Sequence, residues 1–428
     1  MAYMDVQSKD FTIEKAVLVG LNSPVYTAAE NADEESLDEL EALLETAGGI
    51  CVGRVLQNRA TPDSKYVVGQ GKAEEVAQLA KDLEAELIIF DNDLTSSQIK
   101  AMEELSGKHI MDRSGLILDI FAQRAKTKEG RLQVELAQYK YILPRLTGMW
   151  GHLVRQTAAG GKSPIGTRGP GETQLETDRR HIRRKITALE QELKEVRRVR
   201  SVQREKRIKN EVPVVAIVGY TNAGKSTLLN RLTGAGIPAN NRLFDTLDTT
   251  TRKLKVSDTL EVLMSDTVGF IRKLPHHLVE AFKATLEELT FADVLLHVID
   301  VSNPNWEIQA KVVDELIEQL GAAKTPVIEV YNKIDMFDGD IEPHGENKVC
   351  ISAATGQGID DMLALIERVL SAGKRQVRLM LPYSMAGAVD SLYTEATVKS
   401  VEYTPDGIDV VAVCGAKQLG RLEKYIVG

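Results

Sequence analysis

The sequence predicts an α/β protein built from four parts, and three observations support this prediction. Strand-like and helix-like segments alternate over residues 1–125 and again over 211–373, which is typical of mainly parallel sheets covered by helices. Between them, residues 126–210 combine a basic composition with apolar residues at helical spacing, which predicts a long antiparallel helical hairpin. After them, residues 374–428 mix strand and helix patterns, which predicts a small α+β domain.

Composition indicates a globular protein. The chain has 43% hydrophobic and 27% charged residues, no run of eighteen apolar residues and no apolar signal-peptide core, so we expect neither a membrane span nor export. Its three cysteines, Cys51, Cys350 and Cys414, lie far apart and have no metal-ligand spacing. Isolated thiols are typical of the reducing cytoplasm, where we expect the protein to act.

The first part has the pattern of a doubly wound unit. We expect strand 15–21, helix 36–48, strand 50–58, helix 71–85, strand 87–92 and helix 96–105, with HIMDRSG and LILDIF completing the unit. Its run VVGQGKAEE is a glycine-rich turn from strand to helix. Such a turn usually only reverses the chain, although a phosphate site there is an alternative.

Positive charge is concentrated in one segment. The chain carries a net charge of −9, yet residues 121–210 hold 22 Lys or Arg and only 9 Asp or Glu, a local charge of +13. An acidic protein with one basic segment is suited to contact a polyanion. A solvated helix would have the same composition, so charge alone favours neither interpretation.

Apolar residues in this basic segment step by three and four, as they do along the seam of a coiled coil. Two such sets predict two helices packed as an antiparallel hairpin, and two amphipathic helices docked on a core are the alternative. The second helix has a mostly basic polar surface, which indicates that it projects. The first set is Leu132, Leu136, Tyr139, Leu143 and Leu146, and the second is Ile182, Ile186, Leu189, Leu193 and Val196.

A glycine-rich loop, residues 148–178, is expected to join the two helices. Loops of this length in compact proteins are usually functional or disordered. Its backbone, flanked by Lys162 and Arg168, could fit closely against a phosphate backbone. Disorder in the free protein, followed by ordering on binding, would agree with that role.

The chemistry is carried by GYTNAGKS, residues 219–226, which fills every fixed position of the GxxxxGK[ST] pattern between a strand and a helix. Gly219 and Gly224 permit the tight turn that aims backbone N–H groups at a β-phosphate, and the helix N-terminus favours the anion. Lys225 can reach the β- and γ-phosphates, and the Ser226 hydroxyl can ligate Mg²⁺. This segment predicts a P-loop for a nucleoside triphosphate.

Two later motifs, NKID and SAA, identify the base. Asn332 can contact the O6/N7 edge of guanine, and Asp335 can accept from its N1–H and exocyclic amine. Adenine lacks those donors and would leave the Asp335 carboxylate unpaired. The stem of Lys333 can cover the base plane, and the N–H of Ala353 can donate to O6. Each motif follows a strand, where ligands of such sheets bind, so the set predicts a GTPase.

Two switch segments should sense the γ-phosphate and the metal. In DTVG, Asp266 can hold a water on Mg²⁺ and the Gly269 N–H can donate to the γ-phosphate. Phe270 stands where many GTPases carry a Gln that orients the attacking water, so intrinsic hydrolysis should be slow. A threonine that ligates Mg²⁺ should precede DTVG, and spacing does not choose among four of them. The four are Thr246, Thr249, Thr250 and Thr251.

The tail from Gln376 to Gly428 accounts for the fourth part. VRLMLP (377–382) has a strand pattern, a helix follows, two strands flank TPDG, and AKQLGRLEKYIV (416–427) has the pattern of a closing helix. No motif assigns this tail a role.

Nearly the whole chain resembles the HflX family of ribosome-associated GTPases, within the Obg–HflX superfamily. The resemblance lies in GYTNAGKSTLLNRLTG, LFDTLDTTTR, DTVGFIRKLPHHLVEAFKATLEE and NKID, and in the loop GGKSPIGTRGPGETQLETDRR, which is no general GTPase feature. It implies an N-terminal α/β subdomain with a helical hairpin ahead of the GTPase domain. It also implies Thr246 as a Mg²⁺ ligand, and a hydrophobic residue at Phe270 is typical of this group.

The motifs and the resemblance together give the expected site. The expected catalytic residues are Lys225, Ser226, Thr246 and Gly269, of which Ser226 and Thr246 are expected to ligate Mg²⁺. The expected nucleotide-binding residues are Gly219, Tyr220, Thr221, Asn222, Ala223, Gly224, Lys225, Ser226, Phe244, Asp245, Thr246, Leu247, Asp248, Asp266, Thr267, Val268, Gly269, Asn332, Lys333, Ile334, Asp335, Ser352, Ala353 and Ala354.

The resemblance also implies partners. They are GTP and GDP, and the large ribosomal subunit with its RNA, contacted through the basic hairpin and residues 155–175. The resemblance further implies that the ribosome stimulates GTP hydrolysis and that the protein splits or rescues stalled ribosomes. We expect the protein to be a monomer. The rival interpretation is a switch GTPase that regulates a protein or membrane partner without RNA, and a third is a nucleotide hydrolase with no partner. A basic hairpin with a glycine-rich tip favours the first.

Overall fold

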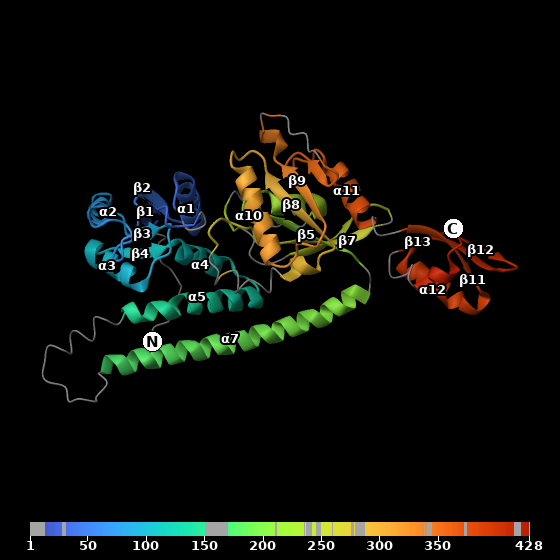
Figure 1. The fold of residues 1–428 in the computed structure, drawn as a ribbon, viewed down its shortest axis with the longest axis horizontal. Helices are drawn as coiled ribbons and strands as arrows, with labels where there is room; N and C mark the ends of the chain where they lie inside the picture. Colours follow the sequence, from blue (N-terminus) through green and yellow to red (C-terminus); the bar gives the residue numbers. More distant parts are fainter. Residues whose placement is uncertain are drawn as a thin grey trace. The chain divides into compact units, whose positions relative to one another are not determined.

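The computed structural model divides into two compact units (Figure 1). The first unit is Met1–Arg200, Pro238–Asp248 and Val268–Leu286, and the second is Ser201–Ile237, Thr249–Thr267 and Glu287–Gly428. The residues described are 13–27, 31–149, 170–209, 212–234, 236, 242–244, 250–258, 260–274, 278, 287–337, 339, 345–371, 375–414 and 421–427.

The first unit contains a four-stranded parallel sheet in the order β2-β1-β3-β4. The predicted alternation of strands and helices is confirmed, but two elements end early. The helix predicted over 71–85 ends at Asp82. The strand β3 ends two residues before the predicted end because Asp91 and Asn92 leave the strand to make side-chain contacts. The strands are β1 (Lys15–Asn22), β2 (Ile50–Asn58), β3 (Leu87–Phe90) and β4 (His109–Asp112), and the helices are α1 (Glu34–Ala47), α2 (Gln70–Asp82), α3 (Ser96–Ser106) and α4 (Arg113–Arg124).

Local sequence explains where two of these helices begin. Asp33 and Ser36 form a capping box at the start of α1, in which each side chain bonds the backbone N–H of the other. Thr95 and Gln98 form the same arrangement at the start of α3. The central strand β1 is buried on both faces, as expected for a parallel strand covered by helices.

Two long helices, α5 (Lys128–Met149) and α7 (Pro170–Lys209), carry the predicted apolar repeat. The prediction of a loop over 148–178 was wrong at both ends, because α5 continues to Met149 and α7 begins at Pro170. Proline suits a first helical position, where no N–H partner is needed. Residues 150–169 lie outside the described residues. One buried cluster joins Leu132, Leu136, Leu189 and Leu193, and Tyr139, Ile186 and Val196 pack against it.

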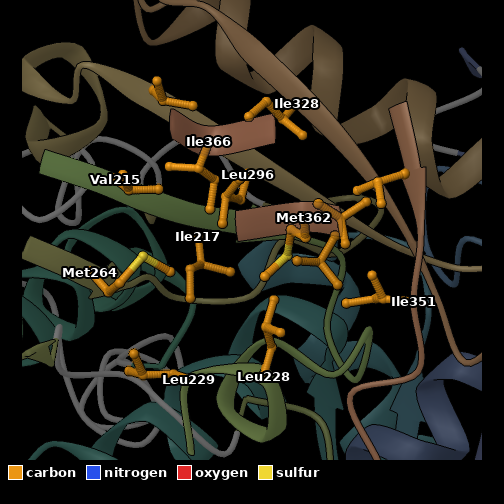
Figure 2. Close-up of a cluster of buried hydrophobic side chains, with 14 of the residues drawn as sticks. Val215, Ile217, Leu228, Leu229, Met264, Leu296, Ile328, Ile351, Met362 and Ile366 are labelled. Carbon is orange, nitrogen blue, oxygen red and sulfur yellow. The ribbon is translucent and has the colours of Figure 1, made fainter. Parts of the chain in front are cut away.

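The second unit contains a six-stranded sheet in the order β10-β9-β8-β5-β7-β6, in which only the edge strand β6 is antiparallel. Figure 2 shows its core, where Ile217 and Leu296 from the sheet face Leu228 and Met362 from two helices. The strands are β5 (Val214–Gly219), β6 (Thr251–Lys255), β7 (Glu261–Asp266), β8 (Val294–Asp300), β9 (Val327–Asn332) and β10 (Lys348–Cys350), and the helices are α8 (Lys225–Thr233), α10 (Trp306–Gln319) and α11 (Ile359–Ser371), with short 3₁₀ turns at Glu287–Phe291 and Ile334–Met336.

A separate antiparallel sheet in the order β11-β13-β12 lies in the tail, with its own apolar core. The closing helix predicted over 416–427 was wrong at its end. Residues 423–425 form a 3₁₀ turn, and Ile426 then bridges Leu379, because the edge strand β11 offers unpaired backbone groups. The elements are β11 (Arg375–Leu381), a 3₁₀ turn (Tyr383–Met385), α12 (Ala386–Glu395), β12 (Thr397–Thr404) and β13 (Gly407–Cys414).

Candidate nucleotide-binding site

The P-loop runs from the end of β5 to the start of α8, as the motif requires. Gly219 has φ 155° and Gly224 has φ 96°, and a Cβ on Gly224 would collide with the amide nitrogen of Asn332. Only glycine fits such positions. Asn222 is exposed with φ 61°, a left-handed conformation that asparagine tolerates better than most residues. The backbone is therefore already shaped as an anion-binding turn at a helix N-terminus.

Lys225 lies inside this turn. Its Nζ donates to the carbonyl oxygens of Gly219 at 3.0 Å and Tyr220 at 2.6 Å, and the residue is only 6% exposed. Burial lowers the pKa of the Lys225 ammonium to about 8, although Asp266 opposes this effect and Lys333 adds to it. A phosphate group in the turn would give this buried ammonium an anionic hydrogen-bond acceptor in place of two neutral carbonyl oxygens.

Ser226 and Asp266 form the polar pair beside the turn. The Ser226 hydroxyl donates to Asp266 Oδ2 at 2.9 Å, and Asp266 Oδ1 accepts from the N–H of Thr267 at 3.0 Å. Asp266 is fully buried at the end of β7. A hydroxyl and a carboxylate are hard oxygen donors, and Mg²⁺ is usually held by few such protein ligands together with waters and substrate phosphates. The pair therefore fits Mg²⁺.

Asn332 connects three segments of the site. Its amide nitrogen donates to the Ala223 carbonyl of the P-loop at 2.8 Å, and its amide oxygen accepts from the N–H of Ala353 at 2.9 Å. Asn332 is 1% exposed at the end of β9. The residue predicted to read guanine thus also holds the P-loop and the SAA segment in register with each other.

The remaining predicted base readers lie near Asn332 in sequence. Lys333 has φ 67°, and its Nζ forms a 2.6 Å ion pair with Asp300, the last residue of β8. Asp335 lies in the 3₁₀ turn with Ile334, is exposed, and makes no hydrogen bond or ion pair within the described part of the chain. A carboxylate without an internal partner is available to donors on a ligand.

The SAA segment is buried except at its end. Ser352 is fully buried and its hydroxyl accepts from the N–H of Thr355 at 3.1 Å, while Ala353 is 4% exposed. The carbonyl of the exposed Ala354 accepts from Arg231 of α8 at 2.7 Å. This segment is therefore held from both the P-loop helix and β9.

Other predicted residues have less direct evidence. Tyr220 is buried, and Thr221 Oγ1 is buried without a hydrogen-bond partner among the described residues, which a bound ligand could satisfy. The Thr267 hydroxyl donates to the Ile217 carbonyl at 2.6 Å, so it holds β7 to β5. Thr251 lies in β6, its hydroxyl 3.5 Å from that of Ser265, which is an ordinary position for a strand residue.

The two predicted switch segments fall largely in the first unit. Asp245, Thr246, Leu247 and Asp248, together with Thr249, lie outside the described residues. Phe244 is described, and its ring makes an edge-to-face contact with Phe121, with centroids 4.8 Å apart. Val268 and Gly269 are buried just after β7, where the chain passes from the second unit into the first.

Sequence reasoning missed two polar residues of the site. Asp300 ends the strand VLLHVID and holds Lys333, and its position at the carboxyl end of a parallel strand was a usable signal. Arg231, which holds the SAA segment, had no signal because it is one of many helix-surface arginines. Together, the P-loop, the Ser226–Asp266 pair and the Asn332 connections can bind a nucleoside phosphate and place a base at the same sheet edge.

The chain matches three family models: GTP-binding GTPase N-terminal over residues 34–122, GTP-binding GTPase Middle Region over 124–207, and 50S ribosome-binding GTPase over 214–333. It is 48% identical to GTPase HflX of Caldanaerobacter subterraneus, over 97% of this chain and 94% of that protein. It is 45% identical to GTPase HflX of Escherichia coli K12, over 86% of each. It also aligns with a GTP-binding protein from Sulfolobus solfataricus in complex with GDP, at 23% identity, 84% of this chain, 99% of that chain and a TM-score of 0.43.

Proposed function

The chain belongs to the HflX family of GTPases, and on that premise we propose that its nucleotide state controls its docking on the large ribosomal subunit. The finer outcome that we propose is the splitting or rescue of stalled ribosomes in the cytoplasm, with GTP hydrolysis stimulated by the ribosome. Of the helices described, none has the length and apolar character needed to cross a membrane.

The observation that carries this proposal is the charge on one face of α7. Arg180, Arg183 and Arg184 are exposed there and Arg179 is partly exposed, at the three- and four-residue spacing of a single helical face. Exposed arginines along a helix suit the phosphates of RNA, because each guanidinium can donate two parallel hydrogen bonds to phosphate oxygens. The rival, a protein or membrane partner without RNA, would use the same basic face, and the experiment below separates the two.

In this proposal the two parts of the chain act together. Residues 1–125 and 126–210 are the ribosome-docking part, with α5 and α7 as an antiparallel hairpin and residues 155–175 at its tip. Residues 211–373 are the GTPase, and 374–428 are an additional domain. GTP would order residues 243–252 and 266–275, which would fix the relative pose of the parts, and hydrolysis would release it.

The site residues have distinct proposed roles. P-loop N–H groups and Lys225 bind the β- and γ-phosphates, which spreads the negative charge that develops during phosphoryl transfer. Ser226 and Thr246 would hold Mg²⁺, which supplies charge neutralisation when bound. The Gly269 N–H donates to the γ-phosphate, so its position reports whether that phosphate is present.

The base and the attacking water complete the proposed mechanism. Asp335 accepts from guanine N1–H and the exocyclic amine, while Asn332 keeps the base-binding segments aligned with the P-loop. Phe270 cannot hydrogen-bond a water, so no residue of the second switch orients the nucleophile at that position. We therefore expect slow hydrolysis by the free protein and faster hydrolysis once the ribosome completes the site.

The experiment that tests this proposal measures GTP turnover with and without purified large ribosomal subunits at moderate salt. We expect stimulation of about tenfold or more, because a group supplied from outside can raise kcat by roughly 10³–10⁵ in other GTPases. Deletion of residues 155–175 should remove the stimulation, and binding should weaken steeply as salt rises because counterions are released from RNA phosphates.

Two matched triple variants separate the loss of these particular arginine contacts from a general loss of positive charge. Alanine at Arg180, Arg183 and Arg184 should reduce subunit binding, whereas alanine at Lys81, Lys311 and Lys324, three exposed lysines elsewhere, should not. Equal effects of the two triple variants, or no stimulation by subunits despite normal GTP binding, would remove the ribosome from the proposal and leave only the GTPase.

A further inference from the structure

The sheet of the first unit has a recognisable ligand position. In its strand order β2-β1-β3-β4, β2 lies beyond β1 on one side and β4 lies beyond β3 on the other, so the order of connection switches between β1 and β3. Open parallel sheets bind ligands outside the carboxyl ends of the strands at such a switch point. Asp91 and Asn92 follow β3 at this point. Asn92 is used internally, because its amide oxygen accepts from the Leu21 N–H at 2.8 Å and its amide nitrogen donates to the Leu21 carbonyl at 3.1 Å. Asp91 is buried at the same position, where its Oδ2 accepts from the Ser36 hydroxyl at 2.8 Å and can also take a cationic partner.

The partner of Asp91 at this position comes from the chain's own second switch. Lys273 Nζ forms an ion pair with Asp91 Oδ2, and Asp91 Oδ1 accepts from Arg113 at 2.9 Å. Lys273 lies four residues after Gly269, the predicted sensor of the γ-phosphate. Asp91, Arg113, Gly269 and Lys273 all belong to the first unit.

The neighbouring residue, Arg272, is held as well. Its carbonyl accepts from Arg113 at 3.2 Å, and its guanidinium contacts Glu35 at 3.0 Å and Asp33 at 3.4 Å. Asp33 and Glu35 lie at the start of α1, which follows β1. The two consecutive basic residues are thus bound by groups from the start of α1, the end of β3 and the start of α4.

Burial and charge balance make this contact specific. The side chains of Asp91 and Lys273 are 0% and 6% exposed, and Arg113 also pairs with Glu39. Asp91, Glu39, Arg113 and Lys273 balance to zero charge, so removal of Lys273 would leave one uncompensated negative charge in a buried cluster. Burial raises the pKa of Asp91, but Arg113 and Lys273 outweigh it, and the net pKa lies below the usual range, so the carboxylate stays ionised.

The first switch contacts the same unit. The N–H of Leu243 donates to the Thr46 hydroxyl of α1 at 3.2 Å, and Phe244 packs edge-to-face on Phe121 of α4. Parts of both switches are therefore bound by the N-terminal α/β sheet and its helices.

We propose that the carboxyl edge of the N-terminal α/β sheet, where Asp91 follows β3, is a docking site for the Arg272–Lys273 segment of the second switch, and that Asp91 is a positioning residue for GTP hydrolysis. This inference rests on the proposed role of Gly269 in γ-phosphate binding. Three residues span at most about 10 Å, so an anchored Arg272 restricts the positions open to the Gly269 N–H. An anchored switch also loses less entropy when GTP binds, which favours GTP over GDP.

The first test measures dissociation constants for GDP and a non-hydrolysable GTP analogue, together with turnover, all without ribosomes. Lys273→Met should weaken analogue binding by about tenfold relative to GDP binding and lower kcat, and Lys273→Arg should recover most of both. Lys311→Met, at an exposed lysine of α10, should change neither quantity. Preference for the analogue within twofold of the wild type in folded Lys273→Met would overturn the proposal.

A second test needs no variant and so remains informative if Lys273→Met fails to fold. Hydrogen exchange of the wild-type chain should differ between the GDP-bound and analogue-bound states in peptides covering residues 31–40 and 88–94. Identical exchange there, with a difference at the P-loop as positive control, would overturn the docking. Because neither test contains ribosomes, a failure here is separate from a failure of ribosome stimulation.

Discussion

The hydroxyl of Ser226 donates a 2.9 Å hydrogen bond to the carboxylate of Asp266. The two residues come from the start of α8 and the end of β7, so the contact fixes the P-loop helix against the strand that leads into the second switch. Their oxygens are also those that suit Mg²⁺. This single hydrogen bond therefore connects the phosphate-binding turn to the second switch at the position where we expect Mg²⁺ to bind.

We expect Ser226→Ala to raise the Mg²⁺ concentration needed for half-maximal GTP binding by about tenfold or more, because a direct protein ligand is lost. Stability should fall by only about 1–3 kcal/mol, the cost of removing one partner from a buried acceptor. A Mg²⁺ titration of fluorescent GTP binding measures the first effect. Thr233→Ala, which removes a hydroxyl that donates to the Leu229 carbonyl in the same helix, is the control. An unchanged Mg²⁺ requirement would exclude Ser226 as a ligand.

The lowered pKa of Lys225 predicts a pH dependence of GTP binding. In the free protein this pKa is about 8, whereas bound phosphates favour the charged form and raise it. GTP binding above about pH 8 therefore takes up a proton, so the affinity for GTP should fall by up to about tenfold per pH unit in that range. Below about pH 8 Lys225 is already charged, and the affinity should not depend on its titration.

The control for that prediction is Lys225→Arg, because a guanidinium stays charged at every pH tested. The titration of the nucleotide itself affects both proteins equally and therefore cancels in the comparison. Dissociation constants measured between pH 6.5 and 9.5 would reveal the difference. Parallel curves for the wild type and Lys225→Arg would show that Lys225 binds GTP with its ordinary pKa.

Residue patterns predicted those parts of the fold that depend on nearby sequence. Gly219, Gly224 and Lys225 were found because a phosphate-binding turn needs particular residues at fixed spacing. The structure gives the two glycines positive φ angles and buries Lys225. The strands and helices of the first unit were found for the same reason, since apolar periodicity and capping residues act over a few positions.

Features that depend on distant residues could not be predicted. Asp91 and Lys273 are 182 residues apart, and neither lies in a motif that specifies a partner. The pairing of Lys333 with Asp300 likewise depends on which strands become neighbours in the sheet. Local composition also misled at Pro170, because Gly and Pro content suggested a loop where a proline in fact starts a helix.

Asn332→Ala should destabilise the second unit as well as weaken GTP binding. The substitution leaves the buried Ala223 carbonyl and Ala353 N–H without the partner they now have, which costs about 1–3 kcal/mol for each group. Urea unfolding of the nucleotide-free protein measures the loss. Gln78→Ala, which removes an exposed amide of α2, should be nearly neutral. A normal midpoint for Asn332→Ala would restrict Asn332 to contacts with the nucleotide.

Leu189→Ala should loosen the contact between α5 and α7. Leu189 is 6% exposed within the cluster that contains Leu132 and Leu136, and truncation of a buried leucine costs about 2–5 kcal/mol. Val199→Ala on the same helix, where the side chain is 47% exposed, is the matched control. Limited proteolysis within α7 should accelerate only for Leu189→Ala. Equal resistance of the two variants would mean that the seam contributes little to holding these helices together.

Asp335→Asn should change which base the enzyme accepts. The carboxylate of Asp335 is exposed and makes no hydrogen bond or ion pair among the described residues, so its replacement by an isosteric amide should leave the fold intact. An amide can donate to the exocyclic oxygen that xanthine carries in place of the amine of guanine.

We therefore expect Asp335→Asn to weaken GTP binding by at least about a hundredfold and to improve XTP binding relative to the wild type. Competition of XTP and GTP against one fluorescent nucleotide gives both affinities in a single assay. Asp360→Asn, at the exposed start of α11, controls for the loss of a surface carboxylate. If the variant keeps the wild-type preference for GTP, a residue other than Asp335 reads the N1–H edge of the base.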